Sequence, residues 1–260
     1  MNKFEMQDTE YAFPYHWLYY DDVNGVYFLD KFYSRGRFWY RSGNEVIVDK
    51  VMQVCAVPQL SKSYLDVGCG DGKLIDCIKS NNEGQIEYMC GCDLSEKAIG
   101  FAKAFNPDID FFTGDFADIQ RTFDCITCIE TLEHIPDENL TQFIKMLFSK
   151  LNRGGTLIIT VPTTCQPVSR KHYRHYTWEI LKQELDDSVP NNYEVVEYQY
   201  MNKEKTSIIM RLYYKLFCGR HSIKIYRVDN IFYKYYKKHF LYGNDEKECI
   251  RLLAVLRKIS

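Results

Sequence analysis

A glycine-rich turn between an apolar, strand-like run and a helical pattern is the feature that most limits how this chain can fold. Residues 65–72 read LDVGCGDG, with glycines at positions 68, 70 and 72. Glycine accepts the left-handed backbone of a tight turn and lets a ligand approach the main chain closely. In open α/β sheets such a turn lies at the carboxyl edge, where these sheets bind their ligands. The segment therefore predicts an α/β domain with a ligand at this turn.

The pattern around the turn is typical of a sheet with helices on both faces, because short apolar or β-branched runs alternate with amphipathic ones. We expect strands at residues 63–68, 86–93, 109–114, 123–129, 155–161 and 193–201. We expect helices at residues 72–80, 95–105, 137–151 and 177–185, with Ser95 and Thr177 as N-caps. Residues 63–201 are therefore predicted to form a doubly wound, mostly parallel Rossmann-like α/β core.

Residues 1–62 differ from this core. They are rich in Tyr, Phe and Trp, show no clear strand alternation and end in a helical run at residues 44–54. We expect this segment to lie across the carboxyl edge of the sheet as a lid, with residues 13–17 and 32–41 near the ligands. The second stretch includes Arg35, Arg37 and Arg41.

The segment 202–260 is expected to be a second, basic and aromatic elaboration. Residues 201–260 hold 14 Lys and Arg against 5 Asp and Glu, although the whole chain has a net charge of −2. Ten aromatic residues are interleaved with these cations. We favour an amphipathic cap whose aromatic residues pack inward. Peripheral contact with a membrane surface, or contact with nucleic acid, is the alternative.

Composition limits the class of protein further. The chain has 260 residues, of which 46% are hydrophobic and 26% charged, so it can bury a sizeable core. It has no apolar run of the ~20 residues that a membrane-spanning helix needs, and its first residues do not read as a secretory signal. We therefore expect a cytoplasmic protein whose ten cysteines are reduced core residues. In a strand, Cys125 and Cys128 would point to opposite faces, which disfavours a shared metal or redox site.

The glycine turn does not match two common nucleotide-binding loops. A dinucleotide fingerprint requires glycine where Lys73 stands, and a phosphate loop requires Ser or Thr where Leu74 stands. Asp66 and Asp71 make the turn acidic, which disfavours a pyrophosphate. A cationic nucleoside fits better. S-adenosylmethionine carries an ammonium and a sulfonium group that acids stabilise, and its carboxylate can bind backbone N–H groups at a helix start.

The ends of the next two predicted strands add contacts for such a nucleoside. Asp93 lies 23 residues after Gly70, about where an acid accepts hydrogen bonds from a ribose diol. Asp115 can accept from the adenine amino group, and Leu94 and Phe116 can sandwich the ring. Three successive strand ends therefore predict amino-acid, ribose and adenine contacts.

With these motifs in order, the sequence resembles the class I S-adenosylmethionine-dependent methyltransferases. The matching segments are LDVGCGDGKL (65–74), CGCDLS (90–95), GDF (114–116), FDCITCIETLEHIPD (123–137) and LNRGGTLIITVP (151–162). The resemblance covers residues 60–190 and implies S-adenosylmethionine as cofactor and S-adenosylhomocysteine as product. The residues implied in cofactor binding are Asp66, Gly68, Cys69, Gly70, Asp93, Leu94, Asp115, Phe116 and Ile129.

Two later segments are expected at the acceptor side of the pocket. If residues 130–136 turn helically, Glu130, Glu133 and His134 share one face. The segment 171–177, which contains His172 and His175, follows the fifth strand at the same edge. A histidine with a pKa near neutrality can take the proton of an acceptor hydroxyl as the methyl group is transferred. His134, His172 and His175 are therefore the candidate catalytic residues, unless the acids and His134 are only local helix-start residues.

The resemblance extends to two subgroups with different acceptors. LEHIP followed by an HYRHYT-like segment is widespread among enzymes acting on small molecules, including ubiquinone-biosynthesis O-methyltransferases and enzymes of glycan and natural-product clusters. The ExxEH spacing with a later histidine also resembles the divalent-metal site of small-RNA 3′-terminal 2′-O-methyltransferases. That pattern would place Mg²⁺ or Mn²⁺ on Glu130, Glu133, His134 and His172.

We therefore predict a methyltransferase that modifies a hydroxyl of a small molecule or glycan by SN2 transfer. A divalent-metal-dependent RNA 2′-O-methyltransferase is the alternative within enzymes. A non-catalytic S-adenosylmethionine-binding scaffold or sensor is the alternative outside them. The acceptor itself is not encoded in the donor motifs.

Overall fold

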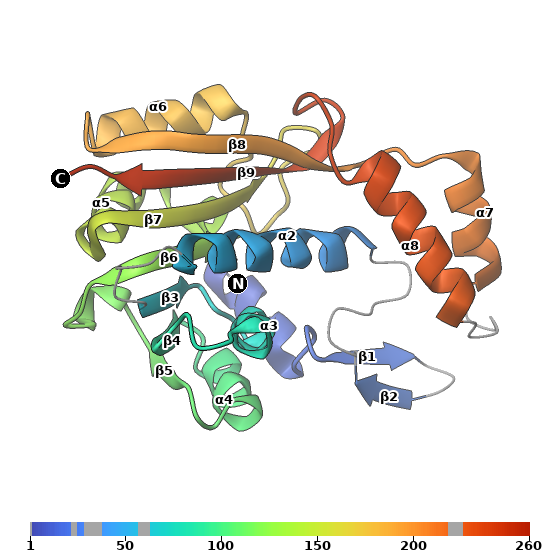
Figure 1. The fold of residues 1–260 in the computed structure, drawn as a ribbon, viewed down its shortest axis with the longest axis horizontal. Coiled ribbons are helices and arrows are strands. Elements are labelled where there is room, and N and C mark those ends of the chain that lie inside the picture. Colours follow the sequence, from blue (N-terminus) through green and yellow to red (C-terminus); the bar gives the residue numbers. More distant parts are fainter. Residues whose placement is uncertain (1, 22–24, 29–37, 57–62, 218–225) are drawn as a thin grey trace.

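The computed structural model describes residues 2–21, 25–28, 38–56, 63–217 and 226–260. Its centre is a seven-stranded sheet with the order β5-β4-β3-β6-β7-β9-β8 (Figure 1). The strands are β3 (Ser63–Val67), β4 (Tyr88–Asp93), β5 (Asp110–Thr113), β6 (Phe123–Ile129), β7 (Leu151–Pro162), β8 (Tyr193–Lys203) and β9 (Cys249–Lys258). The first five are parallel, whereas β9 runs antiparallel to both of its neighbours. The predicted mostly parallel, Rossmann-like sheet is confirmed.

Helices cover both faces of this sheet. On one face, α2 (Phe38–Cys55), α3 (Lys73–Asn81) and α4 (Glu96–Phe105) contribute to one hydrophobic cluster. On the other, α5 (Asp137–Ser149) and α6 (Trp178–Ser188) contribute to a second cluster. Side chains of Ser95 and Thr177 accept from backbone N–H groups at the starts of α4 and α6, so both predicted N-caps are confirmed.

The buried cysteines are part of this packing. Cys125 belongs to the α2–α3–α4 cluster and Cys128 to the α5–α6 cluster, so their side chains lie on opposite faces of β6. Cys90, Cys92, Cys125 and Cys128 are buried free thiols, as the sequence predicts, whereas Cys165 is only half-buried and lies outside the hydrophobic clusters. Burial raises the pKa of the Cys128 thiol well above its usual value, which keeps this group protonated and inert.

The N-terminal segment begins with α1 (Lys3–Asp8) and a short 3₁₀ turn, η1 (Thr9–Ala12). A small hairpin follows, formed by β1 (Leu18–Asp21) and β2 (Gly25–Phe28), before α2 begins. Two further 3₁₀ turns, η2 (Phe116–Asp118) and η3 (Leu132–His134), follow β5 and β6 at the carboxyl edge of the sheet.

The C-terminal segment differs from the expected boundary at residue 201. Helices α7 (Ile208–Phe217) and α8 (Tyr226–Phe240) form a lobe beside the sheet, but β9 returns into the sheet between β7 and β8 (Figure 1). Residues after 201 are therefore part of the core sheet as well as an elaboration of it. The reason is hydrophobic: Leu252, Leu253, Ala254, Val255 and Leu256 are all buried, as an interior strand requires.

The lobe is held by a third cluster of mainly aromatic residues. Phe38 at the start of α2 packs against α7 and α8, and the buried members are Phe38, Met210, Tyr213, Tyr233, Tyr236 and Phe240. The aromatic residues of the basic segment that belong to this cluster thus pack inward, as favoured from the sequence. In the described residues, no helix is both long and apolar enough to cross a bilayer.

Candidate active site

A pocket of ≈ 790 Å³ opens at the carboxyl edge of the parallel strands. Residues after β3, β4, β5 and β6 line it, together with residues of α1, α2, α5 and β9. The cofactor-binding residues predicted from the sequence all line this pocket: Asp66, Gly68, Cys69, Gly70, Asp93, Leu94, Asp115, Phe116 and Ile129. Strand order brings these positions together, because parallel strands end at one edge of the sheet.

The glycine turn has the backbone that its sequence predicts. Gly68 has φ +76° and Gly70 has φ +55°, both in the left-handed region. A Cβ on Gly68 would lie 2.3 Å from Thr131 Oγ1, and one on Gly70 would lie 2.5 Å from the Tyr11 hydroxyl. No larger residue fits at either position, since the loop after β6 and the N-terminal segment close on the turn.

Asp66 lies beneath the turn at the end of β3. Its side chain is buried and accepts a hydrogen bond of 2.6 Å from Thr127 Oγ1. Burial raises its pKa to about 7, and the Thr127 hydrogen bond opposes part of this shift. The pocket therefore contains a carboxyl group that gains a proton close to neutral pH.

Asp93 connects the glycine turn to β4. Its carboxylate accepts from the Gly70 N–H at 2.9 Å and from the Ser95 N–H at 2.8 Å. Burial raises the pKa of Asp93, while these two N–H groups favour the charged form. A fixed, half-buried acceptor at this strand end is what recognition of a ribose diol requires.

The other end of the pocket is apolar. Leu94 is 59% exposed, whereas Phe116 is buried and meets Phe143 edge-on, with ring centroids 5.2 Å apart. Asp115 caps η2 by accepting from the Ala117 N–H at 2.9 Å. Phe143 and Met146 of α5 also line this end and were not singled out from the sequence. In sequence, both belong to the apolar pattern of α5, which gives no sign of a ligand, and in the structure both are half-buried.

These features fit the chemistry of S-adenosylmethionine. The left-handed glycines leave no room for side chains in the cradle, Asp93 offers an acceptor, and Leu94 and Phe116 offer apolar contact. The acidic side chains also suit a cationic ligand.

The acceptor side contains Glu130, whose backbone is left-handed with φ +51°. Its carboxylate accepts from Thr160 Oγ1 at 2.9 Å and pairs with Arg251 Nε at 3.1 Å. The predicted helical turn with Glu130, Glu133 and His134 on one face is therefore wrong. The turn is 3₁₀ and begins after Glu130, so Glu130 is held by β7 and β9 instead.

Glu133, His134 and His172 do come together, with potential ligand atoms within 4.8 Å of one another. Glu133 is 1% exposed, and its Oε2 has no hydrogen-bond partner among the described residues. Burial raises the pKa of Glu133 well above its usual value, and the charge of Glu130 acts in the same direction. Three of the four residues named for a metal site are thus neighbours.

A hydrogen-bond chain orders the histidines. His175 Nδ1 lies 3.0 Å from the Gln166 carbonyl oxygen, and His175 Nε2 lies 2.8 Å from His172 Nδ1. Because a carbonyl only accepts, a neutral His175 carries its proton on Nδ1 and accepts at Nε2. His172 then donates from Nδ1, which leaves the lone pair on its Nε2. His134 and His172 line the pocket, while His175 lies buried behind His172.

The two pocket histidines are neutral near pH 7. Burial lowers the pKa of His134 to about 4, and the charge of Lys171 adds to this effect. Burial lowers the pKa of His172 to about 3, with the neighbouring His134 and His175 acting in the same direction. Both imidazoles are therefore unprotonated and free to accept, but each is a weaker base than the near-neutral histidine expected from the sequence.

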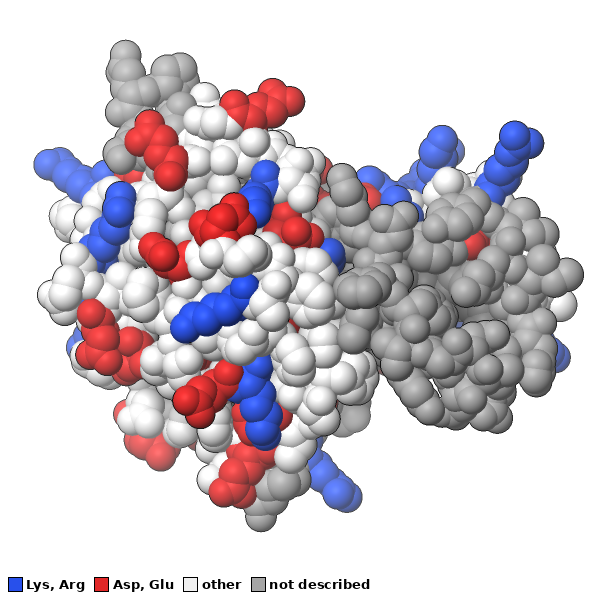
Figure 2. Space-filling view, turned by 90° about the horizontal axis from the view of Figure 1, so that it is seen from below, with Lys and Arg blue, Asp and Glu red and all other residues white. Residues whose placement is uncertain are grey.

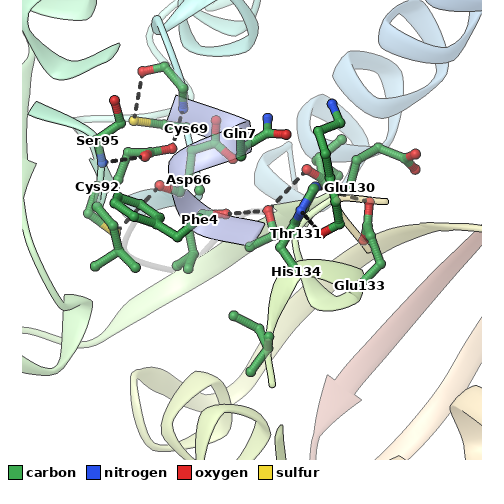
Figure 3. Close-up of a pocket in the computed structure, with 18 of the residues that line it drawn as sticks. Phe4, Gln7, Asp66, Cys69, Cys92, Ser95, Glu130, Thr131, Glu133 and His134 are labelled. Carbon is green, nitrogen blue, oxygen red and sulfur yellow. Dashed lines mark hydrogen bonds and ion pairs between the residues drawn. The ribbon is translucent and has the colours of Figure 1, made fainter. Parts of the chain in front are cut away.

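Helix α1 spans the pocket from the cofactor side to the acceptor side. Asp8 accepts from Ser95 Oγ at 2.5 Å and pairs with Lys97, while Lys3 donates to the His172 carbonyl. Figure 3 shows Phe4 and Gln7 between Cys69, Cys92 and Ser95 on one side and Glu130, Glu133 and His134 on the other.

The segment after α1 clamps the glycine turn. Asp71 is fully buried and accepts from the backbone N–H of His16, while its other oxygen lies 2.9 Å from His16 Nδ1. Trp17 Nε1 donates to the Asp71 carbonyl at 2.8 Å. Of the lid arginines, Arg35 and Arg37 lie outside the described residues, and Arg41 pairs with Glu45 at 3.0 Å.

Fold and pocket together define the class I S-adenosylmethionine-dependent methyltransferase architecture. A family model described as a methyltransferase domain matches residues 39–222. This chain belongs to the methyltransferase-domain family, and the resemblance noted in its motifs is confirmed.

Solved structures show the same fold. An S-adenosylmethionine-dependent methyltransferase from Clostridium acetobutylicum aligns with a TM-score of 0.54 at 13% identity, covering 85% of this chain and 92% of that one. Magnesium protoporphyrin IX methyltransferase from Synechocystis, solved with S-adenosylhomocysteine, aligns with a TM-score of 0.52 at 17% identity, covering 86% of each chain.

Curated relatives are closer in sequence over shorter spans. The ubiquinone biosynthesis O-methyltransferase of Coxiella burnetii is 38% identical over 110 residues, which is 38% of this chain and 43% of that protein. The enzyme of the same name from Xanthomonas campestris is 30% identical over 149 residues, or 51% and 59% of the two chains. This chain thus spans about half the length of these relatives.

Proposed function

We propose that this protein is an S-adenosylmethionine-dependent O-methyltransferase that modifies a hydroxyl of a small molecule or glycan. The observation that carries the proposal is one pocket with a glycine cradle and Asp93 at one side and neutral His134 and His172 at the other. The two ubiquinone biosynthesis O-methyltransferases support an oxygen acceptor. The buried thiols support a reducing, cytoplasmic setting.

The residues on the donor side of the pocket would bind and orient S-adenosylmethionine. When bound, S-adenosylmethionine supplies an electrophilic methyl group on a positively charged sulfur. In our proposal Asp93 holds the ribose hydroxyls, Leu94 and Phe116 contact the adenine, and the glycine turn gives access to backbone N–H groups. Helix α1 excludes water from above. Orientation of this kind supplies much of the rate in a bimolecular transfer.

The acceptor side moves a proton. With S-adenosylmethionine bound, the acceptor hydroxyl would give its proton to His172 Nε2 while its oxygen takes the methyl group, and neutral S-adenosylhomocysteine would be the leaving group. His175 acts through His172, since it fixes the tautomer that leaves this nitrogen free. His134 and the buried Glu133 border the same space. His175 is therefore a positioning residue rather than a catalytic one.

The donor assignment is tested by calorimetric titration of S-adenosylhomocysteine. Asp93→Ala should lose ~1.5–3 kcal/mol of binding free energy, as expected for hydrogen bonds to a charged group. Asp187→Ala, at an exposed acid on α6, serves as the matched control and should bind as the wild type does. Equal affinity of the Asp93→Ala variant would remove the ribose assignment, and no heat in the wild type would remove the methyltransferase proposal.

The base assignment is tested by turnover with a panel of hydroxylated acceptors. His172→Gln should lower kcat by ~10²–10⁴, the usual contribution of general base catalysis. The exposed His239 on α8 gives a matched control, His239→Gln, with unchanged kcat. Full activity of His172→Gln would leave His134 as the base to test, and absence of turnover with any acceptor class would favour a non-catalytic scaffold or sensor.

A metal-dependent RNA 2′-O-methyltransferase is the second candidate, because Glu133, His134 and His172 offer one carboxylate and two imidazoles within 4.8 Å. Calorimetric titration of Mn²⁺ into chelator-treated protein tests it. Binding that Glu133→Gln abolishes, together with RNA affinity that falls steeply with salt, would favour this candidate. No Mn²⁺ binding by the wild type would exclude it. Glu130 is held by Thr160 and Arg251 and is not needed for this cluster.

A further inference from the structure

Helix α7 has two apolar faces, and the fold buries one of them. Met210 and Tyr213 are buried in the cluster around Phe38. The opposite side carries four aliphatic residues that are between 52% and 75% exposed: Ile208, Ile209, Leu212 and Leu216. Single exposed apolar residues are normal, but a contiguous apolar stripe on one helix marks an interaction surface. Positions 208, 212 and 216 recur at i, i+4 and i+8 and thus form such a stripe.

Cations border this stripe. Arg211 and Lys215 are exposed on α7 and stand at i+3 and i+7 from Ile208, along one edge of the apolar stripe. The aliphatic stems of such residues can lie on an apolar surface while the charged ends stay in water. The helix therefore has the layout of one that lies in a membrane interface, with an apolar face and a basic margin.

The neighbouring helix adds a basic face. On α8, Arg227, Lys234 and Lys238 are exposed at spacings of seven and four, so they lie on one side of the helix. Ile231, at 65% exposure, stands among them. Figure 2 shows Lys and Arg side chains projecting at the margin of the smaller lobe.

The chemistry of this surface selects among possible partners. A symmetric contact between two copies would bring like charges together, which is unfavourable. Nucleic acid would use the cations but gain nothing from isoleucine and leucine, and the clustered aromatic residues Tyr213, Tyr233 and Tyr236 are buried rather than free to stack on bases. An anionic bilayer uses both the apolar stripe and the cations.

We propose that the exposed stripe of α7, with Arg211 and Lys215 at its margin, docks this protein on an anionic phospholipid bilayer. Ile208, Leu212 and Leu216 enter the boundary between headgroups and acyl chains, and Arg211 and Lys215 contact the lipid phosphates. This surface belongs to the lobe rather than to the pocket, so docking is a function beyond methyl transfer. It would keep the enzyme at a surface where apolar or lipid-linked acceptors concentrate.

Flotation with phosphatidylcholine vesicles, with and without phosphatidylglycerol, tests this docking on the whole chain. The wild type should float only with the anionic vesicles. Leu212→Glu should reduce partitioning about tenfold or more, since it removes a leucine side chain that the bilayer would otherwise bury. Charge reversal at Arg211 and Lys215 should reduce partitioning about fivefold or more for each residue, from the ~1 kcal/mol of each interfacial cation.

Matched substitutions outside the lobe test whether a loss of flotation is specific to the docking surface or follows from any added negative charge. Ile180→Glu on α6 and Lys103→Glu on α4 change an exposed aliphatic and an exposed basic residue outside the lobe and should leave flotation unchanged. All variants should bind S-adenosylhomocysteine as the wild type does, which shows that they fold. The proposal is overturned if the wild type does not float, or if Leu212→Glu floats normally. It is also overturned if Leu212→Glu instead dissociates a dimer, or if the lobe binds RNA in preference to vesicles.

Discussion

At the scale of single residues, Asp66 couples the donor site to pH. Its pKa is about 7 in the folded protein, against a usual value of 3.8. Between these values the folded chain binds more protons than the unfolded chain, so the free energy of unfolding falls as pH rises through this window. A carboxyl group that lowers the free energy of unfolding when it ionises, and is nevertheless present, is typical of a functional site.

Replacing Asp66 with asparagine should relieve this cost, because the amide oxygen can still accept from Thr127. We expect Asp66→Asn to raise the Tm relative to the wild type at pH 8.5, by about 2–4 °C for each kcal/mol relieved. The gain should shrink at pH 5, where the wild-type carboxyl is already protonated. Thermal melts at the two pH values measure this, and an equal gain at both would contradict the assignment.

His134 gives a second test at this scale. NMR titration of its ring should show a neutral imidazole down to about pH 4, because burial and the charge of Lys171 disfavour the proton. The spectrum of His134→Gln identifies the resonance. A midpoint near 6.5 would mean that the imidazole is well solvated and that the pocket is more open than the structure describes.

The donor residues were predictable because one local signal specifies each of them. Gly68, Gly70 and Asp93 stand at strand ends with a characteristic spacing, and strand order then brings them together. Glu130 was misjudged because its left-handed backbone depends on Thr160 and Arg251, which are 30 and 121 residues away in sequence. Such a backbone in a non-glycine residue is set by tertiary contacts that no local pattern records.

At the scale of elements, α1 acts as a strap across the pocket. It is tied to α4 through Asp8 and to the histidine segment through Lys3, while η1 brings Tyr11 over Gly70. A lid over this edge was expected from the sequence. Its contacts could not be assigned, because an aromatic-rich segment without periodicity gives no register against the sheet.

We expect the strap to slow the escape of bound ligand. Asp8→Ala removes the contacts with Ser95 and Lys97 and should increase the dissociation rate of S-adenosylhomocysteine several-fold, about what a loss of ~1 kcal/mol produces. Stopped-flow displacement measures the rate. Glu96→Ala, an exposed acid on the first turn of α4, is the control. An unchanged rate for Asp8→Ala would show that α1 does not gate this pocket.

At the scale of the whole molecule, β9 connects the lobe formed by α7 and α8 to the active-site pocket. It carries Arg251 into the pocket, where the guanidinium pairs with Glu130 and lies 5.5 Å from the Trp39 ring of α2. The sequence indicated the parallel strands because each is a compact apolar run beside a helical pattern. It did not indicate β9, since RLLAVLR was grouped with the basic segment that precedes it.

The same strand affects how the molecule forms during synthesis. β9 lies between β7 and β8 but follows both in the chain, after α7 and α8. On the ribosome, β7 and β8 therefore emerge with the edges that will face β9 unpaired, while residues 249–258 are still untranslated. Unpaired edges are templates for pairing with other chains. The nascent chain is thus expected to depend on chaperones or on slow collapse until β9 arrives, although the other described strands of this sheet are already present.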